Sequence, residues 1–505
     1  MTGSGSTGAG GGLPWRVVVI GAGVAGLACA RRLQQQARAD RRPLDLTLLE
    51  AAGRPGGVIE TEHHDDFLVE GGPDCFISEK PWALDLCREL GLADEIVGTN
   101  QACRRSFVLR RGRLIAIPEG FQMLAPARLL PFALSPILSV RGKLRVACDL
   151  ILPRGPEVPD ESLASFVRRR FGHEALERMA QPLVAGIYNA DPERLSVRAT
   201  FPRFLDLERA RRSVILGLIG ARHRAPAGER GTSGARYSLF VTLRRGMGLL
   251  IDRLVAGLAP GTLRLRTPVA SIERGADAAR TARPGEAPAA GTAAGAERPG
   301  RWVVTTEGGE RIPADAAVLA MPAAGAARLV RTVDAGLTGE LASIPYGTSA
   351  TVSLAYRRSD IPRRLDGFGF VVPRAEKRSL IACTFSSVKF PQRAPADAVL
   401  LRAFLGGPAV EEGDPELLTR EAREQLLDIM GIEAPPLLAR SFIWPKAMAQ
   451  YEVGHLDKVE TIEARLGALP GLGLAGNGLR GVGIPDCIKS GDRAAERLSQ
   501  EVTTS

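Results

Sequence analysis

The first sixty residues alternate between apolar runs and polar or glycine-rich breaks. Trp15–Ile20 is a short apolar run rich in β-branched residues, and a glycine-rich turn and a longer stretch to about Arg38 follow it. Leu44–Leu49 is a second apolar run. Short apolar runs with such boundaries are typical of strands, and the stretch between them is typical of a helix. The pattern predicts a strand–helix–strand unit.

Three helices further along the chain are predicted from their end signals. Asp414 and Pro415 form an N-cap and first helical residue, and Gly431 follows the end of the same helix. Proline favours the first turn of a helix and glycine the position after its last turn. A second helix is expected over Asp160–Phe171 and the last one over Asp486–Leu498.

Two stretches are nearly devoid of large apolar side chains. Residues 221–235 and 274–300 consist mostly of Arg, Gly, Ala, Pro and Glu. Such composition cannot bury a core, so both are predicted to be flexible surface loops, as is the tail 1–14. The second stretch lies between the strand-like segments Leu263–Ile272 and Arg301–Thr306, which predicts an extended hairpin loop.

The stretch 115–152 is rich in Leu, Ile, Val and Phe but carries four prolines at 118, 126, 131 and 136. Proline at that density prevents one continuous helix. Three interpretations stay open, namely short helices around an apolar tunnel, a buried helical core, and a patch that lies on a membrane surface. No uncharged apolar run reaches about 18 residues, so no transmembrane helix is expected. We expect a cytoplasmic protein, with the inner face of the cell membrane as its one candidate membrane contact.

Composition and charge limit the function classes. The chain has 505 residues, which is too long for one ordinary core, and a net charge of +10. The basic surplus fits an anionic substrate or an anionic membrane, and no nucleic-acid partner is predicted because no dense basic run is interleaved with aromatics. The seven Cys are scattered without a C-x-x-C motif and the five His lack ligand spacing. Neither a disulfide framework nor a metal site is predicted.

The turn after the first strand carries candidate chemistry. Gly21, Gly23 and Gly26 form G-x-G-x-x-G between the first strand and its helix. These glycines permit a sharp turn, close approach of a pyrophosphate and tight helix–strand packing, and the helix N-terminus offers free N–H groups. Glu50 ends the next strand, where a carboxylate can bind ribose hydroxyls. The order of these features predicts a dinucleotide site.

The segments that follow favour FAD over NAD. A Gly-Gly pair ending at Gly57 lets the chain fold back over the dinucleotide, and Arg54 can balance the pyrophosphate charge. Residues 309–322 predict a returning strand with an Asp before it and a Pro after it. Residues 471–487 predict a strand, a glycine-rich turn and the last helix, whose N-terminus suits the flavin edge that becomes negative on reduction. No second dinucleotide site for NAD(P)H is predicted, which favours an oxidase.

These motifs resemble the porphyrinogen oxidase family within the amine-oxidase-like flavoproteins. The matching stretches include GAGVAGLACA, LLEAAGRPGGVIET, VEGGPDCF, PLVAGIYNADPERLSVRATFPRF, WPKAMAQYEVGHL and GNGLRGVGIPDCIKSG. The resemblance implies an α/β fold with α+β parts, made of a Rossmann-like FAD-binding domain of the p-hydroxybenzoate-hydroxylase type, a mixed-sheet substrate domain and a small helical domain. We expect the first at 15–85, 245–330 and 455–500, the helical one at 86–220, and the substrate domain at 331–454 with part of 180–245.

The resemblance also implies a reaction. A porphyrinogen, either coproporphyrinogen III or protoporphyrinogen IX, would lose six electrons in three two-electron rounds. FAD would accept each hydride and O2 would reoxidise it, releasing three H2O2. The flavin carries this chemistry, so no catalytic side chain is expected. Handover of product to ferrochelatase, peripheral membrane contact and a homo-oligomer are left open.

The resemblance assigns site residues position by position. The tetrapyrrole would be held by the Gly186 carbonyl and lined by Val371, Thr384 and Phe404, with Phe404 stacking on the ring. Core packing is the alternative for Val371 and Phe404. The FAD contacts would be Gly21, Ala22, Gly23, Val24, Ala25, Gly26, Glu50, Ala51, Arg54, Gly57, Gly72, Pro73, Asp74, Val269, Trp444, Gly481, Val482, Gly483 and Ile484.

One position departs from the family pattern. Ser106, before Phe107, stands where protoporphyrinogen oxidases commonly have an arginine for a propionate, and Arg104 and Arg105 lie just upstream. We expect Ser106 and Arg105 to face a propionate. The arginine surplus suits the four propionates of coproporphyrinogen, and the 115–152 stretch looks more like the coproporphyrinogen-oxidising branch, so that substrate is favoured.

Two other functions compete with this one. The first is an amine oxidase or carotenoid desaturase of the same fold, which is disfavoured because an amine oxidase needs an aromatic cage and the C-terminal glycine-rich turn contains no tyrosine. The second is a redox-silent FAD-binding protein. It would need a blocked flavin face, and nothing in the sequence indicates one.

Overall fold

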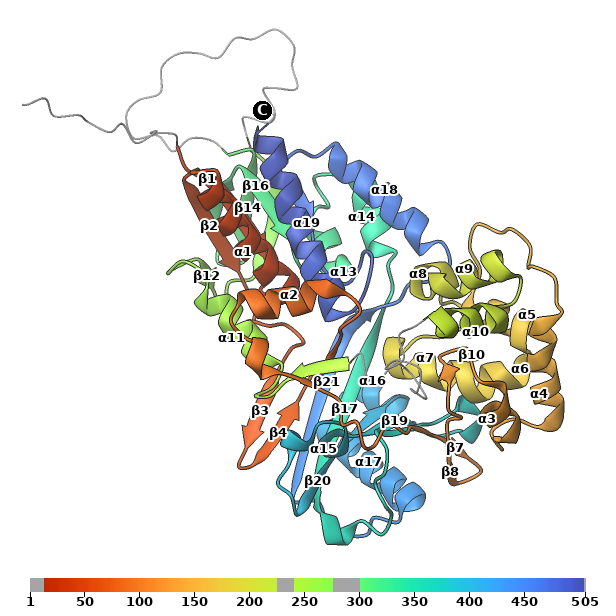
Figure 1. Ribbon diagram of the computed structural model, residues 1–505. Coiled ribbons are helices and arrows are strands. Elements are labelled where there is room, and N and C mark those ends of the chain that lie inside the picture. The colour runs from red at the N-terminus through yellow and green to blue at the C-terminus, as the bar shows by residue number, and fades with distance from the viewer. Residues whose placement is uncertain (1–12, 225–239, 276–299, 504–505) are drawn as a thin grey trace, which may run out of the picture.

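The computed structural model describes residues 13–224, 240–275 and 300–503. The flexible segments predicted at 1–14, 221–235 and 274–300 lie mostly outside the described residues. Within the described part, two sheets dominate, one parallel and one mixed, and a cluster of helices lies to the side of the mixed sheet (Figure 1).

A five-stranded parallel sheet forms the first layer, in the order β12-β2-β1-β16-β22. Helices α1 (Val24–Ala39) and α19 (Ile484–Thr503) run side by side along one face (Figure 1). The predicted bounds of the first two strands are confirmed, and β22 is the strand predicted within 471–487. The five strands are β12 Leu263–Arg264, β2 Leu44–Leu49, β1 Trp15–Ile20, β16 Ala316–Leu319 and β22 Leu472–Leu474.

The opposite face of this sheet is covered by an antiparallel sheet of β13, β14 and β15. Val17 and Val19 of β1 pack in the core that includes α1 and α19, whereas Val18 and Ile20 pack in the core that includes Trp302. Burial on both faces explains why β1 reads as a continuous apolar run. The strands are β13 Val269–Arg274, β14 Trp302–Thr306 and β15 Arg311–Ala314.

The prediction of one strand over Leu263–Ile272 is wrong. The segment divides into β12 of the parallel sheet and β13 of the antiparallel sheet. Pro268 lies at the division, and proline has no N–H to donate to a strand ladder. The hairpin of β13 with β14 is confirmed.

The mixed sheet has seven strands in the order β21-β17-β20-β19-β18-β7-β8. Helix α17 (Pro415–Met430) packs on one face, and its predicted N-cap Asp414 and terminal Gly431 are confirmed. The strands are β21 Leu438–Ala449, β17 Tyr346–Arg357, β20 Ala398–Leu405, β19 Leu380–Phe385, β18 Gly369–Val371, β7 Phe107–Arg110 and β8 Arg113–Ala116.

Helices between residues 129 and 224 share one buried core. The predicted division put all of 86–220 into this helical unit, but β7 and β8 belong to the mixed sheet because β7 pairs with β18. The main helices are α3 Leu129–Leu134, α4 Val140–Ala147, α5 Leu163–Phe171, α7 Gln181–Tyr188, α8 Val197–Thr200, α9 Pro202–Arg211 and α10 Val214–Arg224.

The predicted start of α5 at Asp160 is also corrected. Ser162 is the N-cap, since its hydroxyl accepts a hydrogen bond from the Ser165 N–H at 3.1 Å. Asp160 instead accepts from the Ser196 hydroxyl at 2.8 Å and the Gly454 N–H at 3.0 Å. The Asp160 carboxylate therefore accepts hydrogen bonds from neighbouring chain segments instead of capping α5.

The remaining elements connect these layers. None of the helices that the structure describes combines the length and the apolar character needed to cross a bilayer. The elements used below are β3 Thr61–His64, β4 Phe67–Glu70, β5 Phe76–Ile77, α2 Pro81–Glu89, β6 Ile96–Gly98, β11 Phe240–Leu243, α11 Gly248–Ala256, α15 Ser386–Lys389 and α18 His455–Gly467.

Candidate functional site

The turn between β1 and α1 forms an open cradle. Gly21 has φ +103°, and a Cβ there would lie 2.3 Å from the Ala320 carbonyl oxygen. A Cβ at Gly26 would lie 1.9 Å from the Gly21 oxygen. At Gly23, in contrast, a Cβ would meet no atom within 4 Å, and α1 begins there without a side-chain cap. Open space at an uncapped helix N-terminus, which Ala22, Val24 and Ala25 share, fits a pyrophosphate.

Glu50 lies at the end of β2 beside this cradle. Its carboxylate accepts hydrogen bonds from the Ala22 N–H at 2.7 Å and the Ala52 N–H at 2.8 Å, and Ala51 lies exposed between these contacts. The Thr267 N–H donates to the Glu50 carbonyl at 2.8 Å, two residues before Val269 begins β13. Glu50 and Val269 are therefore near each other, as a shared adenosine site requires.

The chain folds back onto the cradle after Glu50, as predicted. The Gly56 N–H donates to the Ala22 carbonyl at 2.8 Å, and a Cβ at Gly57 would lie 3.5 Å from the Gly23 Cα. Arg54 is engaged within this loop, where its guanidinium donates to the Gly57 carbonyl at 2.8 Å and pairs with Glu60 at 2.9 Å. Its role at the pyrophosphate stays a prediction.

The segment 71–74 continues the same path away from the cradle. A Cβ at Gly72 would lie 1.6 Å from the Val58 carbonyl oxygen, so only glycine fits there. The Trp444 Nε1–H donates to the Gly71 carbonyl at 2.9 Å, which ties β21 to this segment. Residues 71–74, which include Gly72, Pro73 and Asp74, thus form a strip that packs against Val58 and contacts Trp444.

The C-terminal glycine-rich turn approaches from the other side. Gly481 has φ +148°, a Cβ there would lie 2.2 Å from the Asp486 Cγ, and its N–H donates to the Tyr451 hydroxyl at 2.7 Å. Val482, Gly483 and Ile484 complete the turn and begin α19. A Cβ at Gly491 would lie 2.2 Å from the Ala25 oxygen, so the α1 and α19 backbones touch.

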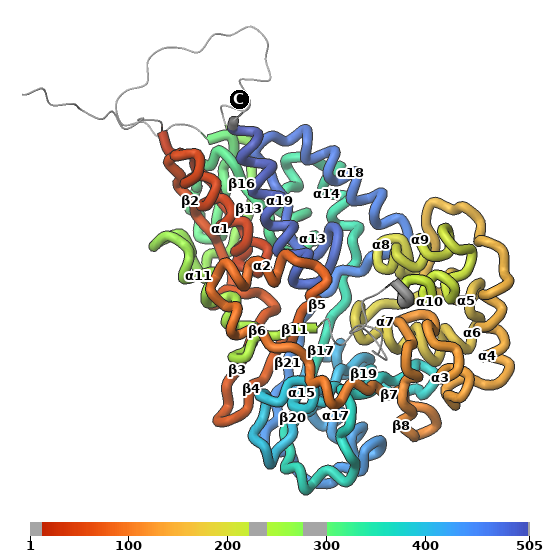
Figure 2. The backbone as a smooth tube through the Cα atoms, in the orientation of Figure 1, coloured from red at the N-terminus to blue at the C-terminus, as the bar shows by residue number. Residues whose placement is uncertain are grey.

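Segments 16–57 and 471–487, which both carry predicted flavin contacts, lie close together in space. Strands β1 and β22 both pair with β16, and helices α1 and α19 lie against each other (Figure 2).

The predicted substrate residues gather where α7 faces the mixed sheet. The atom nearest to a Cβ at Gly186 is Val371 Cγ1, at 4.0 Å. Cα pairing joins Val371 to Ala382 of β19 and Ala382 to Phe404 of β20, while Thr384 lies two residues along β19. Side chains two residues apart share one sheet face. Val371, Thr384 and Phe404 therefore share the face opposite to α17, and the stacking role of Phe404 stays a prediction.

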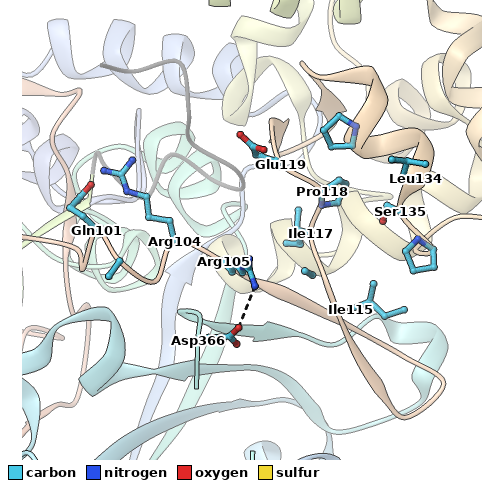
Figure 3. Close-up of a pocket in the computed structure, with 14 residues that line it drawn as sticks. Gln101, Arg104, Arg105, Ile115, Ile117, Pro118, Glu119, Leu134, Ser135 and Asp366 are labelled. Atoms are coloured by element: carbon cyan, nitrogen blue, oxygen red, sulfur yellow. Dashed lines mark hydrogen bonds and ion pairs between the residues drawn. The ribbon is translucent and has the colours of Figure 1, made fainter. Parts of the chain in front are cut away.

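Ser106 and Arg105 precede β7 at the edge of this sheet. Ser106 is buried, and its carbonyl accepts from the Ile117 N–H at 2.8 Å. Arg105 is mostly exposed and pairs with Asp366 at 3.3 Å. A cavity of about 830 Å³ opens here, lined by Arg104, Arg105, Ile115, Ile117, Pro118 and Leu134 among others (Figure 3).

Sequence reasoning missed two cations beside the strip, of which Arg402 is buried and Lys389 is 12% exposed. Lys389 ends α15, and its ammonium contacts Asp74 at 2.9 Å. Arg402 lies inside β20, and its guanidinium donates to the Gly71 carbonyl at 3.2 Å. The signal for Arg402 was a single charge inside the apolar run AVLLRAFL, since a charged residue is almost never buried without a partner.

A metal site is not indicated by the described residues, among which no group of three or more His, Cys, Asp or Glu could hold an ion.

The fold and the cradle define a flavin-dependent oxidoreductase. The family described as flavin containing amine oxidoreductase matches residues 24–499. The chain is 32% identical to coproporphyrinogen III oxidase of Bacillus subtilis (95% of this chain, 96% of the relative) and 33% identical to that of Propionibacterium freudenreichii (95% and 90%). A crystal structure from Exiguobacterium sp. 255-15 superposes with a TM-score of 0.81 at 30% identity, covering 98% of this chain and 100% of the other.

The chain therefore belongs to the flavin containing amine oxidoreductase family, and within it to the porphyrinogen oxidases that these relatives represent. The predicted family and fold class are confirmed.

Proposed function

We propose that this chain is an FAD-dependent porphyrinogen oxidase that converts coproporphyrinogen III to coproporphyrin III with O2 as acceptor and H2O2 as product. The observation that carries this proposal is that helices α1 and α19 bring the Gly23 cradle and the Gly481 turn together, and that Val482 of this turn and Val371 of the mixed sheet pack against the same helical core. The names of the relatives support the reaction class.

The residues present fit FAD. The open space at Gly23 takes a pyrophosphate, and Glu50 retains acceptor capacity for a ribose. Trp444, Gly72 and the N-terminus of α19 would border the ring. Bound FAD supplies a two-electron acceptor, which no protein side chain offers.

The chain's own task is to hold the macrocycle. Gly186 lies in the last turn of α7, where carbonyl groups lack partners within the helix. Its carbonyl is thus suited to accept pyrrole N–H groups, while Val371 and Phe404 offer apolar contact and help to exclude water. Arg104 Nε is buried without a hydrogen-bond partner among the described residues, at the cavity that Arg105 also lines. Guanidinium groups suit carboxylates, which favours the substrate with four propionates.

An aerobic assay tests the proposal. The FAD-loaded protein is incubated with coproporphyrinogen III or protoporphyrinogen IX while porphyrin fluorescence and peroxide are recorded. We expect kcat/KM to favour coproporphyrinogen III by about ten-fold or more, since each charge-assisted hydrogen bond contributes about 1.5–3 kcal/mol. The Ser106→Arg variant should improve protoporphyrinogen turnover. Porphyrin formation from neither substrate would refute the proposed function, and turnover of an amine instead would favour the amine-oxidase alternative.

The apolar side chains of the stretch 115–152 are partly buried and partly exposed. Phe121, Phe132 and Ile137 are buried in the helical core. Other large apolar side chains on α3, α4 and just beyond them are strongly exposed, namely Leu130 71%, Leu134 76%, Val140 73%, Leu144 64% and Ile151 74%.

Apolar exposure of this extent, interleaved with Arg141 and Lys143, suits an interface with anionic lipid. We propose that this face rests on the membrane surface. Handover to ferrochelatase, the cytoplasmic location and a homo-oligomer stay predictions.

A vesicle experiment tests the membrane contact. Leu130→Asn combined with Leu134→Asn should lower binding to vesicles of anionic phospholipid by at least about ten-fold, because burying one leucine side chain is worth about 1.5–3 kcal/mol. Leu437→Asn is the matched control, since Leu437 is 51% exposed on a different part of the fold, and it should bind like the parent. Equal binding of all three proteins would contradict the proposal.

A further inference from the structure

Five ionisable side chains gather between the 71–74 strip and the mixed sheet. Glu70, Arg393 and Arg402 are buried, and the side chains of Lys389 and Asp74 are 12% and 21% exposed. Burial of charge is costly unless the charges are paired and hydrogen-bonded. A cluster of five such groups beside the proposed cofactor strip therefore calls for a functional explanation.

Four of the five form two ion pairs. Lys389 Nζ contacts Asp74 Oδ2 at 2.9 Å and Cys75 Sγ at 3.2 Å, and Arg393 contacts Glu70 Oε1 at 3.0 Å. Burial by itself would raise the pKa of Asp74, but Lys389 and Arg402 hold this pKa well below its usual range. Burial opposes the charge on Lys389 as well, yet Asp74 raises the pKa of Lys389. Both members of this pair are therefore charged.

Arg402 is the fifth member and has no carboxylate within ion-pair distance among the described residues. Its guanidinium donates to the Gly71 carbonyl at 3.2 Å and the Thr351 hydroxyl at 3.4 Å, and lies 5.0 Å from the centre of the Phe404 ring. Its Nε is buried without a hydrogen-bond partner in the described part of the chain. Burial lowers the pKa of Arg402, but arginine stays protonated in proteins.

The cluster therefore carries a positive surplus. Lys389, Arg393 and Arg402 are three cations against the two carboxylates of Glu70 and Asp74, which leaves one positive charge. Burial raises the pKa of Glu70, and protonation of Glu70 would only enlarge the surplus. The sign of the charge is the same in either state.

This charge lies directly behind the predicted cofactor strip. Arg402 and the Trp444 indole both donate to the Gly71 carbonyl, and Lys389 binds Asp74 at the other end of the strip. Arg402 also shares a sheet face with Phe404 two residues along β20. The cluster thus contacts both the proposed cofactor strip and the proposed substrate face.

We propose that the buried positive charge of Lys389, Arg393 and Arg402, offset only in part by Glu70 and Asp74, raises the reduction potential of the bound flavin. This inference rests on the proposed function, because it requires FAD beside residues 71–74. Bound FAD would supply a hydride acceptor for a substrate C–H bond, so the ring would gain two electrons, one proton and one negative charge, while the substrate would release one N–H proton to water. A buried cation favours the anionic ring over the neutral oxidised one.

Charge-changing variants of the FAD-loaded protein test the sign of this effect. Midpoint potentials are measured by equilibration with reference dyes. Lys389→Met removes a positive charge and should lower the potential, whereas Asp74→Asn removes a negative charge and should raise it. The double variant restores the original net charge and should return to a value between the two, near that of the parent. Lys458→Met is the control, since the half-buried Lys458 on α18 donates to the Ser343 carbonyl and not to the cluster, and it should leave the potential unchanged.

If the cluster had only a structural role, both single variants would shift the midpoint potential of the flavin in the same direction. Shifts of the same sign, or no shift in either, would overturn the inference. If Lys389→Met does not fold, Arg402→Met removes a positive charge at the other end of the strip and should also lower the potential. An unchanged or higher potential in Arg402→Met would overturn the inference as well. A parent protein that takes up no flavin would instead refute the proposed function.

Discussion

The Gly23→Val variant is expected to fold normally and to lose its flavin. The backbone at Gly23 is extended (φ −68°, ψ 174°), which valine adopts readily, and a Cβ there meets no protein atom within 4 Å. The side chain would fill the cradle and block the N–H groups at the start of α1. Loss of two charge-assisted hydrogen bonds at about 1.5–3 kcal/mol each predicts an affinity at least about 100-fold weaker. Titration of apoprotein with FAD measures this loss, and circular dichroism melting reports the fold.

Two other glycines provide the comparison. A Cβ at Gly98 in β6 also meets no atom within 4 Å, so Gly98→Val should retain both fold and flavin. A Cβ at Gly26 would lie 1.9 Å from the Gly21 oxygen, so Gly26→Val should lose stability as well as flavin. Unaltered FAD affinity in Gly23→Val would show that the cradle is misassigned.

Asp149→Ala is expected to destabilise the protein by about 3–5 kcal/mol, the usual cost of removing one partner of a buried ion pair. Asp149 is fully buried and accepts hydrogen bonds from Arg170 Nε at 2.6 Å, the Ser213 hydroxyl at 2.6 Å and the Ile215 N–H at 2.9 Å. It thereby joins α5 to the start of α10. Without it, the Arg170 guanidinium, 1% exposed, loses its closest carboxylate. Denaturant unfolding of apoprotein measures the free-energy change.

Asp85→Ala is the matched substitution at the surface. Asp85 pairs with Arg88 at 2.9 Å across one helical turn, and the two side chains are 53% and 61% exposed. Exposed pairs contribute about 1 kcal/mol or less. If Asp149→Ala and Asp85→Ala lowered the free energy of unfolding equally, burial would not set the strength of the Asp149 contacts.

The parts of the fold that the sequence predicts well are those with local signals. β1 and β2 have the predicted bounds because their apolar runs end abruptly at Gly21 and Glu50. The Asp414 cap is equally local. The pairing of β7 with β18 joins residues about 260 positions apart, and no local pattern encodes such a register.

The candidate site likewise has parts that a local motif predicts and parts that only the fold brings together. The Gly23 cradle and Glu50 follow from a motif with a direct physical reading. The Lys389–Asp74 and Arg402–Gly71 contacts span 315 and 331 residues, so only the folded chain brings them together. Arg54 shows a further limit of prediction from sequence. Its guanidinium was assigned to the cofactor, but it also donates to Gly57 and Glu60 in its own loop.

Anaerobic mixing of the FAD-loaded protein with coproporphyrinogen III tests the account most directly, because it asks whether the flavin held by these segments takes electrons from the macrocycle. We expect the yellow flavin band to bleach while porphyrin absorption rises, with three flavins reduced for each porphyrin formed, and the colour to return when O2 is admitted. A flavin that stays oxidised in the presence of excess coproporphyrinogen III and of excess protoporphyrinogen IX would contradict the account.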